Sequence, residues 1–197
     1  METKNSRKAF MVLMASISVL VIGFIITGFI IFSIKGKKII EEEENGANLI
    51  ITYTDDRTGL KMMDTHPTTD ELGMKNLTKG EYFDFSVDVD LDNAARVEYE
   101  IALVKNIKTS SLTNDDVRVY LEKEESGTYT KVFGPEKFTP LTKKTKYGSK
   151  IGTMVVYKLK KSNSTSDKYR LRIWMSEKAK DATGSFDVDV VVNGKAE

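Results

Sequence analysis

The strongest constraint on the fold is an alternation of apolar and polar residues at a period of two. It is clearest over 83–91, where Phe or Val or Leu stands at every odd position and Asp or Ser at every even one. Because successive side chains of a strand point to opposite faces of a sheet, this segment predicts a strand with one buried and one solvated face. Comparable patterns occur over 97–103, 117–121, 169–175 and 186–192, with shorter candidates at 49–54, 129–133 and 154–160.

These eight segments are separated by turn-forming Gly, Pro, Asn and Asp residues, and no segment has a convincing helical period. Strands with one solvent-exposed face are typical of antiparallel sheets, whereas the strands of parallel sheets are continuous apolar runs. We therefore expect an all-β, antiparallel β-sandwich of jelly-roll-like type over 48–197. The segments 139–150 and 160–168, rich in Lys, Ser and Thr, are the expected long loops.

A second constraint is the run Ala9–Ile34, which is 26 residues long and carries no charge. As a helix it reaches about 39 Å, more than the roughly 30 Å of a bilayer core. A cleavable signal peptide has a shorter apolar region, and this run continues directly into Lys35, Lys37 and Lys38. We expect an uncleaved transmembrane helix, with removal as a signal peptide as the alternative.

The chain is thus expected to comprise a cytoplasmic tail (1–8), a transmembrane helix (9–34), a polar stalk (35–47) and an extracellular β-sandwich (48–197). Basic residues on the two sides of the span are nearly equal in number, so they do not decide its orientation. A Cys-free all-β domain after one N-terminal span is the usual layout of an exported domain. We expect a single-pass cell-membrane protein with its N-terminus inside.

Composition excludes several kinds of chemistry. The chain has no Cys, which excludes thiol catalysis, disulfides and Cys-based metal sites. Its net charge of +1 argues against a strongly basic nucleic-acid binder. His66 is the single histidine, so a His-Glu-x-x-His zinc site is impossible, and we expect an exposed loop residue. No cofactor is expected.

The triplet Asp88-x-Asp90-x-Asp92 resembles the opening of a calcium loop. That template requires Gly at its sixth position and Glu at its twelfth, where this chain has Asn93 and Tyr99. The EF-hand interpretation fails. The expected role is a solvated acidic strand face, with a weak cation site at the strand end as the alternative.

Two candidate ligand surfaces remain, and the first surrounds Trp174. If its strand is regular, the indole lies on the same face as Arg170 and Arg172. Such a group can form a cation–π ladder or a sugar-stacking face. The alternative is that Trp174 packs under a loop or against the second sheet.

The second candidate is the lysine-rich segment 137–150, in which Lys143, Lys144 and Lys146 are expected to be exposed. These side chains suit an anionic wall polymer, lipid head groups or a polysaccharide. The alternative is that they only keep the surface soluble or protect a sheet edge.

Two groups of motifs resemble known exported proteins. Asn76-Leu77-Thr78-Lys79-Gly80-Glu81, with the strand patterns at 89–93 and 99–103, resembles the camelysin/TasA-like exported proteins of Gram-positive bacteria. In that family an Asn-Leu-x-x-Gly turn precedes a strand. The segments 169–177 and 186–194 are similar to a C-terminal pattern in singly anchored surface proteins of the same bacterial groups.

The resemblance implies a jelly-roll-like sandwich outside the cell. For TasA-like members it implies assembly into biofilm fibres, in which each subunit lends an N-terminal strand to its neighbour. This chain departs from that pattern because it is expected to keep its anchor. The metalloprotease assignment of camelysin is not carried over, since His66 alone offers no zinc-binding motif.

We therefore expect a non-enzymatic, membrane-anchored surface or matrix protein that contacts itself, other surface proteins or cell-wall polymer, and no nucleic acid. If strand donation operates, the segment 48–54 is the expected donor, through Leu49, Ile50, Ile51 and Tyr53. The main alternative is a carbohydrate- or polyanion-binding module. A hydrolase whose site is not visible in the sequence, and an accessory domain of a membrane complex, are further alternatives.

Overall fold

The structure is a computed structural model that describes residues 37–38, 47–53, 57–75, 82–91, 94 and 96–196. The chain divides into two units, Met1–Lys37 and Lys38–Glu197, and nearly all described residues belong to the second. Within the described part, no helix is long and apolar enough to cross a membrane. The predicted tail, the predicted span and most of the predicted stalk lie outside the described residues.

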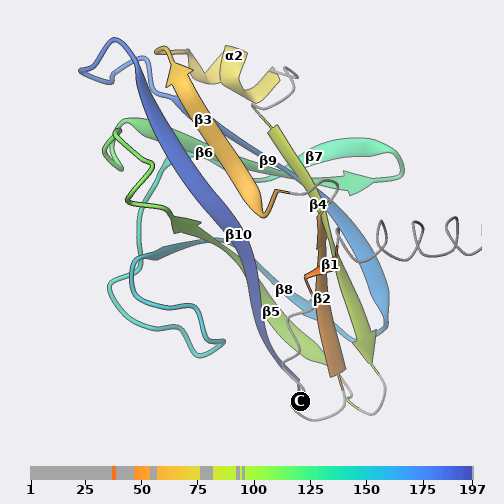
Figure 1. Cartoon of the computed structure of the whole chain (residues 1–197). Coiled ribbons are helices and arrows are strands. Elements are labelled where there is room, and N and C mark those ends of the chain that lie inside the picture. Colours follow the sequence, from red (N-terminus) through yellow and green to blue (C-terminus); the bar gives the residue numbers. More distant parts are fainter. Residues whose placement is uncertain are drawn as a thin grey trace, which may run out of the picture. The chain divides into compact units, whose positions relative to one another are not determined.

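The second unit is built from two β-sheets, with one short helix, α2 (Asp70–Lys75), in the part of the chain that the structure describes (Figure 1). The first sheet has the order β1 (Lys37–Lys38), β2 (Ala47–Tyr53), β4 (Tyr82–Leu91), β9 (Thr165–Met175), β6 (Val117–Glu125), β7 (Thr128–Lys137). The second has the order β3 (Gly59–Thr65), β10 (Gly184–Ala196), β5 (Val97–Lys105), β8 (Thr153–Lys161).

Every neighbouring pair from β2 to β7 in the six-stranded sheet, and every pair in the four-stranded sheet, is antiparallel. The expectation of an all-β fold with antiparallel sheets is confirmed. The period-two segments form β4, β5, β6, β9 and β10, as the alternation requires.

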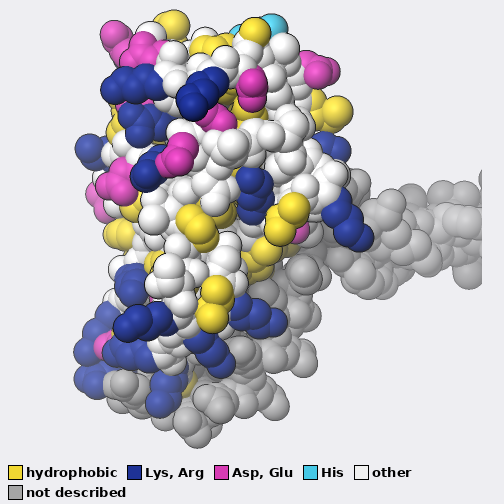
Figure 2. All heavy atoms as spheres, turned by 90° about the vertical axis from the view of Figure 1, so that its left-hand side faces the viewer, with side chains coloured by type: hydrophobic (Ala, Val, Ile, Leu, Met, Phe, Trp, Pro, Cys, Tyr) yellow, Lys and Arg dark blue, Asp and Glu magenta, His cyan; other side chains and the backbone are white. Residues whose placement is uncertain are grey.

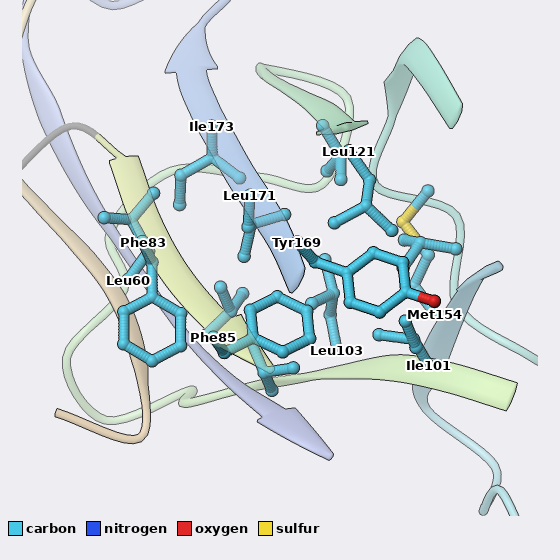
Figure 3. Packing of buried hydrophobic residues seen from close by; sticks show 14 of the residues in the cluster. Leu60, Phe83, Phe85, Ile101, Leu103, Leu121, Met154, Tyr169, Leu171 and Ile173 are labelled. Carbon is cyan, nitrogen blue, oxygen red and sulfur yellow. The ribbon is translucent and has the colours of Figure 1, made fainter. Parts of the chain in front are cut away.

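The core lies between the two sheets and is filled by the apolar positions of that alternation (Figure 3). Aromatic rings run across the inner face of the six-stranded sheet. The ring of Phe83 lies 5.7 Å from that of Tyr53 and 5.9 Å from that of Phe85, and Phe85 lies 5.4 Å from Tyr169. Strand β5 of the other sheet supplies Tyr99, Ile101 and Leu103, all fully buried.

One predicted loop is confirmed and the other is wrong. The segment between β7 and β8 is a long connection that contains 139–150. The segment 160–168 is instead mostly strand, because β8 continues to Lys161 and β9 begins at Thr165. Its inward positions hold Thr165 and Asp167 in place of apolar residues, so this segment lacks the apolar–polar alternation that predicts a strand.

Asp167 forms an ionic cluster that joins the two sheets. Its Oδ1 lies 3.1 Å from Nζ of Lys123 on β6, and its Oδ2 lies 2.6 Å from Nζ of Lys161 on β8. The three side chains are only 11 to 16% exposed. Tyr99 donates a hydrogen bond to Oδ2 at 3.4 Å, and its hydroxyl lies 3.2 Å from that of Tyr169.

Burial pushes the pKa of Asp167 upward, but hydrogen bonds from Lys161 and Lys123 outweigh it, and the net pKa is below the ordinary value. Burial also raises the pKa of Tyr99 and Tyr169, so both tyrosines stay neutral. The cluster therefore holds one carboxylate between two ammonium groups at the edge of the core.

Replacing Asp167 by Asn should lower the free energy of unfolding by about 2 kcal/mol at pH 7, between the values for exposed and buried ion pairs. Because the folded-state pKa is lowered, this stabilisation is complete above about pH 5 and is lost as the pH falls through the folded pKa. The difference in the free energy of unfolding between the Asp167→Asn chain and the unmodified chain should thus disappear in acid. Urea unfolding of the full chain, followed by fluorescence of its single tryptophan, measures it.

Asp115→Asn is the control, since the Asp115 side chain is 77% exposed and pairs with Lys137 only at the surface, 2.8 Å away. It should leave the unfolding midpoint unchanged at every pH. A loss in Asp167→Asn that persists unchanged at pH 2 would contradict the assigned role of the carboxylate charge.

Candidate functional site

Arg170 lies on the outer face of β9 and is held by partners within the domain. Its Nε and Nη2 each donate to a carboxylate oxygen of Asp84 at 2.7 Å. The guanidinium carbon lies 4.5 Å from the ring centre of Tyr82 and 4.2 Å from that of Tyr129. The hydrogen bonds to Asp84 raise the pKa of Arg170. A cation–π group therefore exists here, and its rings are tyrosines.

Arg172 is even less accessible, with a side chain that is 5% exposed. Its Nη1 pairs with the Glu122 carboxylate on the neighbouring strand β6. Burial lowers the pKa of Arg172. This guanidinium thus stabilises the outer face of the sheet and presents little surface to a ligand.

Trp174 is covered by helix α2 and is 5% exposed. Its Nε1 donates to Oδ1 of Asp70 in the first turn of α2 at 3.2 Å. A Cβ added to Gly73 of α2 would lie 2.2 Å from indole Cδ2, so only glycine allows the helix to approach this closely. Of the two expected placements, the structure has the packed one, and the indole is closed to a sugar arriving from solvent.

The lysine-rich loop between β7 and β8 is fixed to the outer face of the four-stranded sheet. Thr145 donates its hydroxyl hydrogen to Glu100 of β5, and the amide of Ser149 donates to the same Thr145 oxygen at 3.1 Å. Asn193 of β10 donates to the Ser149 hydroxyl at 3.0 Å. The loop is therefore attached to this face by hydrogen bonds.

A second anchor of the loop is Glu98, two residues before Glu100 on β5. Tyr147 donates to its Oε2 at 2.5 Å, and Nζ of Lys146 lies 3.4 Å from the same oxygen. Nζ of Lys160 on β8 lies 3.6 Å from Oε1. The hydrogen bond from Tyr147, first among several contacts, lowers the pKa of Glu98.

The predicted lysines Lys143, Lys144 and Lys146 are all exposed, as expected for this loop. Sequence reasoning missed the two carboxylates beneath them. The Glu-x-Glu spacing at 98–100 places both side chains on the outer face of one strand, which was the available signal. Which segment covers that face depends on strand pairing, and no local pattern encodes that pairing.

The predicted donor segment forms β2, which pairs with β4 from Ala47 opposite Leu91 to Tyr53 opposite Phe85. Ile51 and Tyr53 are buried, and Tyr53 donates its hydroxyl hydrogen to the Val190 carbonyl of the other sheet at 3.0 Å. Burial raises the pKa of Tyr53 to about 12. The remaining donor positions, Leu49 and Ile50, are half-buried.

The acidic triplet offers no evidence of a cation site within the described residues. Asp88 accepts hydrogen bonds from Thr52 at 3.1 Å and Ser166 at 2.5 Å, and Asp92 lies outside the described residues. Among the residues that the structure covers, no three His, Asp or Glu side chains are grouped so as to hold a metal ion. His66 is exposed after β3, as expected.

No protein-family model matches the chain, and no curated protein matches it. Among solved structures, one described as "AvmM Catalyzes Macrocyclization in Alchivemycin A Biosynthesis" is similar at 9% sequence identity and a TM-score of 0.35. The match covers 82% of this chain and 97% of that one. At this TM-score the similarity supports no conclusion about fold or activity. The resemblance to camelysin/TasA-like proteins stays a prediction.

Gly73→Ala should displace α2 from the indole, since a methyl group cannot occupy a position 2.2 Å from a ring atom. Overpacking of this kind costs about 1–3 kcal/mol, and release of the helix exposes Trp174. We expect tryptophan emission to shift to longer wavelength and acrylamide quenching to increase, with the β-type circular dichroism retained.

Leu72→Ala is the matched control in the same helix, because Leu72 is 63% exposed. Its emission and quenching should equal those of the unmodified chain. Unchanged quenching in Gly73→Ala would show that α2 does not cover the indole in solution.

Proposed function

We propose that this chain is a non-enzymatic surface or matrix protein whose jelly-roll-like sandwich is held outside the cell by the N-terminal apolar segment. Its function on this proposal is to make structural contacts with copies of itself, with other surface proteins or with wall polymer. The observation that carries the proposal is the way β2 is bound to β4.

Strand β2 is attached by the interactions that strand donation uses. Seven consecutive residue pairs form a main-chain ladder along β4, and alternate side chains enter the core. Ladders supply affinity in β-augmentation, and side-chain pockets supply specificity. Nothing in the ladder requires the donor to belong to the same chain as the acceptor, so β2 of a second copy can make identical contacts.

The position of β2 favours such an exchange. It lies near one end of the six-stranded sheet, beside the two-residue strand β1, and it is the first long strand of the described chain. Five residues, 54–58, separate it from β3, which belongs to the other sheet. Releasing β2 therefore breaks its ladder with β4 and its short pairing with β1, and it leaves the pairings of β4 with β9 and of β3 with β10 in place.

A cross-linking experiment tests donation, because the chain has no cysteine of its own. Thr52 and Ser86 are directly paired across β2 and β4, where Cβ atoms are within about 5.5 Å. Chains carrying Thr52→Cys are refolded together with chains carrying Ser86→Cys and then oxidised. If β2 is exchanged, we expect a disulfide-linked heterodimer, scored on a non-reducing gel.

Two controls sharpen the result. Thr52→Cys mixed with Ser126→Cys, in the exposed β6–β7 turn, should give no heterodimer. The double variant Thr52→Cys/Ser86→Cys should form an internal disulfide, which shows that the pair can close. Closure within one chain, with no heterodimer at any protein concentration, would refute strand donation.

The alternative function, polyanion binding, is favoured by a separate observation. The lysine-rich loop is exposed but firmly attached, whereas Trp174 is covered. Of the two ligand surfaces considered from the sequence, the loop is therefore the better candidate, and charge is a better basis for recognition than sugar stacking.

A further inference from the structure

On the outer face of the four-stranded sheet, carboxylates lie close to the sheet and ammonium groups lie nearer to the solvent. Glu100 is fully buried and the Glu98 side chain is 20% exposed. The lysines paired with them are far more exposed: 72% for Lys146, 59% for Lys158 and 48% for Lys160. A ligand approaching from solvent therefore meets ammonium groups, while the carboxylates lie underneath.

Strand register extends this arrangement across three strands. Glu98 of β5 is paired with Lys195 of β10 on one side and with Lys160 of β8 on the other. Glu100 is likewise paired with Lys158. Adjacent strands lie about 4.8 Å apart, so Lys195 and Lys160 flank Glu98 within about 10 Å of each other.

With the exposed loop residues, the lysine face consists of six side chains: Lys143, Lys144, Lys146, Lys158, Lys160 and Lys195. They outnumber Glu98 and Glu100 by four charges. In Figure 2 basic side chains gather over the lower part of this side of the molecule with few acidic ones among them, whereas both signs mix near the top. This local excess contrasts with the net charge of +1 for the whole chain.

The face recognises charge and little else. The ring of Tyr147 has Nζ of Lys146 at 4.5 Å and Nζ of Lys158 at 6.0 Å from its centre, so ammonium groups already occupy its surroundings. A base or sugar therefore finds no free stacking surface there. All six cations are lysines, which bind phosphate as point charges and lack the fork geometry with which arginine reads a planar group.

We propose that the lysine face binds a linear polyol phosphate, a polymer of uncharged polyol units joined by phosphodiesters. Such a chain presents a regular series of negative charges and needs no stacking or groove contact. Single-stranded nucleic acid carries the same phosphates but relies on aromatic platforms for its bases, which this face does not provide. The proposal specifies the ligand and location of the polyanion-binding alternative, and it is independent of strand donation.

The test uses the full-length chain in an uncharged detergent and immobilised poly(glycerol phosphate). Binding at 50 mM salt should weaken steeply as salt is added, with a log–log slope of about −4 if six phosphates are neutralised. Lys158→Gln/Lys160→Gln/Lys195→Gln should reduce the slope to about −2 and the affinity at least about tenfold. Replacing the same three lysines by arginine should preserve binding.

The matched control removes three exposed lysines that lie outside both the lysine face and the segment 137–150, namely Lys75, Lys108 and Lys168. This variant has the same net charge and should bind like the unmodified chain. Equal losses in both triple variants would overturn the proposal, because they would show an effect of net charge alone.

Two further results would also overturn it: no binding at 50 mM salt, or tighter binding of single-stranded DNA with the same number of phosphates. The internally cross-linked Thr52→Cys/Ser86→Cys chain separates this proposal from strand donation. It cannot lend β2, yet it should bind the polymer with unchanged affinity.

Discussion

The register of β9 is the constraint on which the rest of the domain depends. This strand lies between β4 and β6, and its odd positions, Tyr169 to Met175, fill the core. Its even positions carry Arg170, Arg172 and Trp174 on the outer face. A slip of one residue would exchange the two sets, placing guanidinium groups in the core and apolar side chains outside. The ion pairs of these arginines with Asp84 and Glu122 therefore specify the register as much as they add stability.

The two outer faces of the sandwich differ in how their charges are used. On the six-stranded sheet, the arginines of β9 are matched by carboxylates on adjacent strands, and α2 covers the indole beside them. On the four-stranded sheet, the carboxylates of β5 lie beneath a loop that adds cations of its own. The first face is internally satisfied, and the second retains an excess of exposed ammonium groups.

Much of the fold could be predicted from the sequence, because a strand with one apolar face can be recognised from the alternation of apolar and polar residues over a short segment. Phe83 to Leu91 is such a strand, and its partners follow the same period. Strand β3 was missed because Leu60 and Met62 are its only buried apolar side chains, and helix α2 was missed because six residues show no period. The pairing of distant segments could not be predicted in this way. Glu98 contacts Tyr147 and Lys160 because segments far apart in the sequence pack together, and local sequence patterns contain no information about such packing.

The ion pairs beneath the loop also affect the entropy of any later association. A free lysine side chain loses roughly 1.5–2 kcal/mol of rotamer freedom when it is fixed. Lys146, Lys158 and Lys160 are already restrained by Glu98 and Glu100 in the unliganded domain. Part of the ordering that an anionic ligand would otherwise impose has thus occurred during folding. On the proposed polymer, a face preorganised in this way would bind and release without rearranging, and successive phosphates would exchange along it while the domain stays in place.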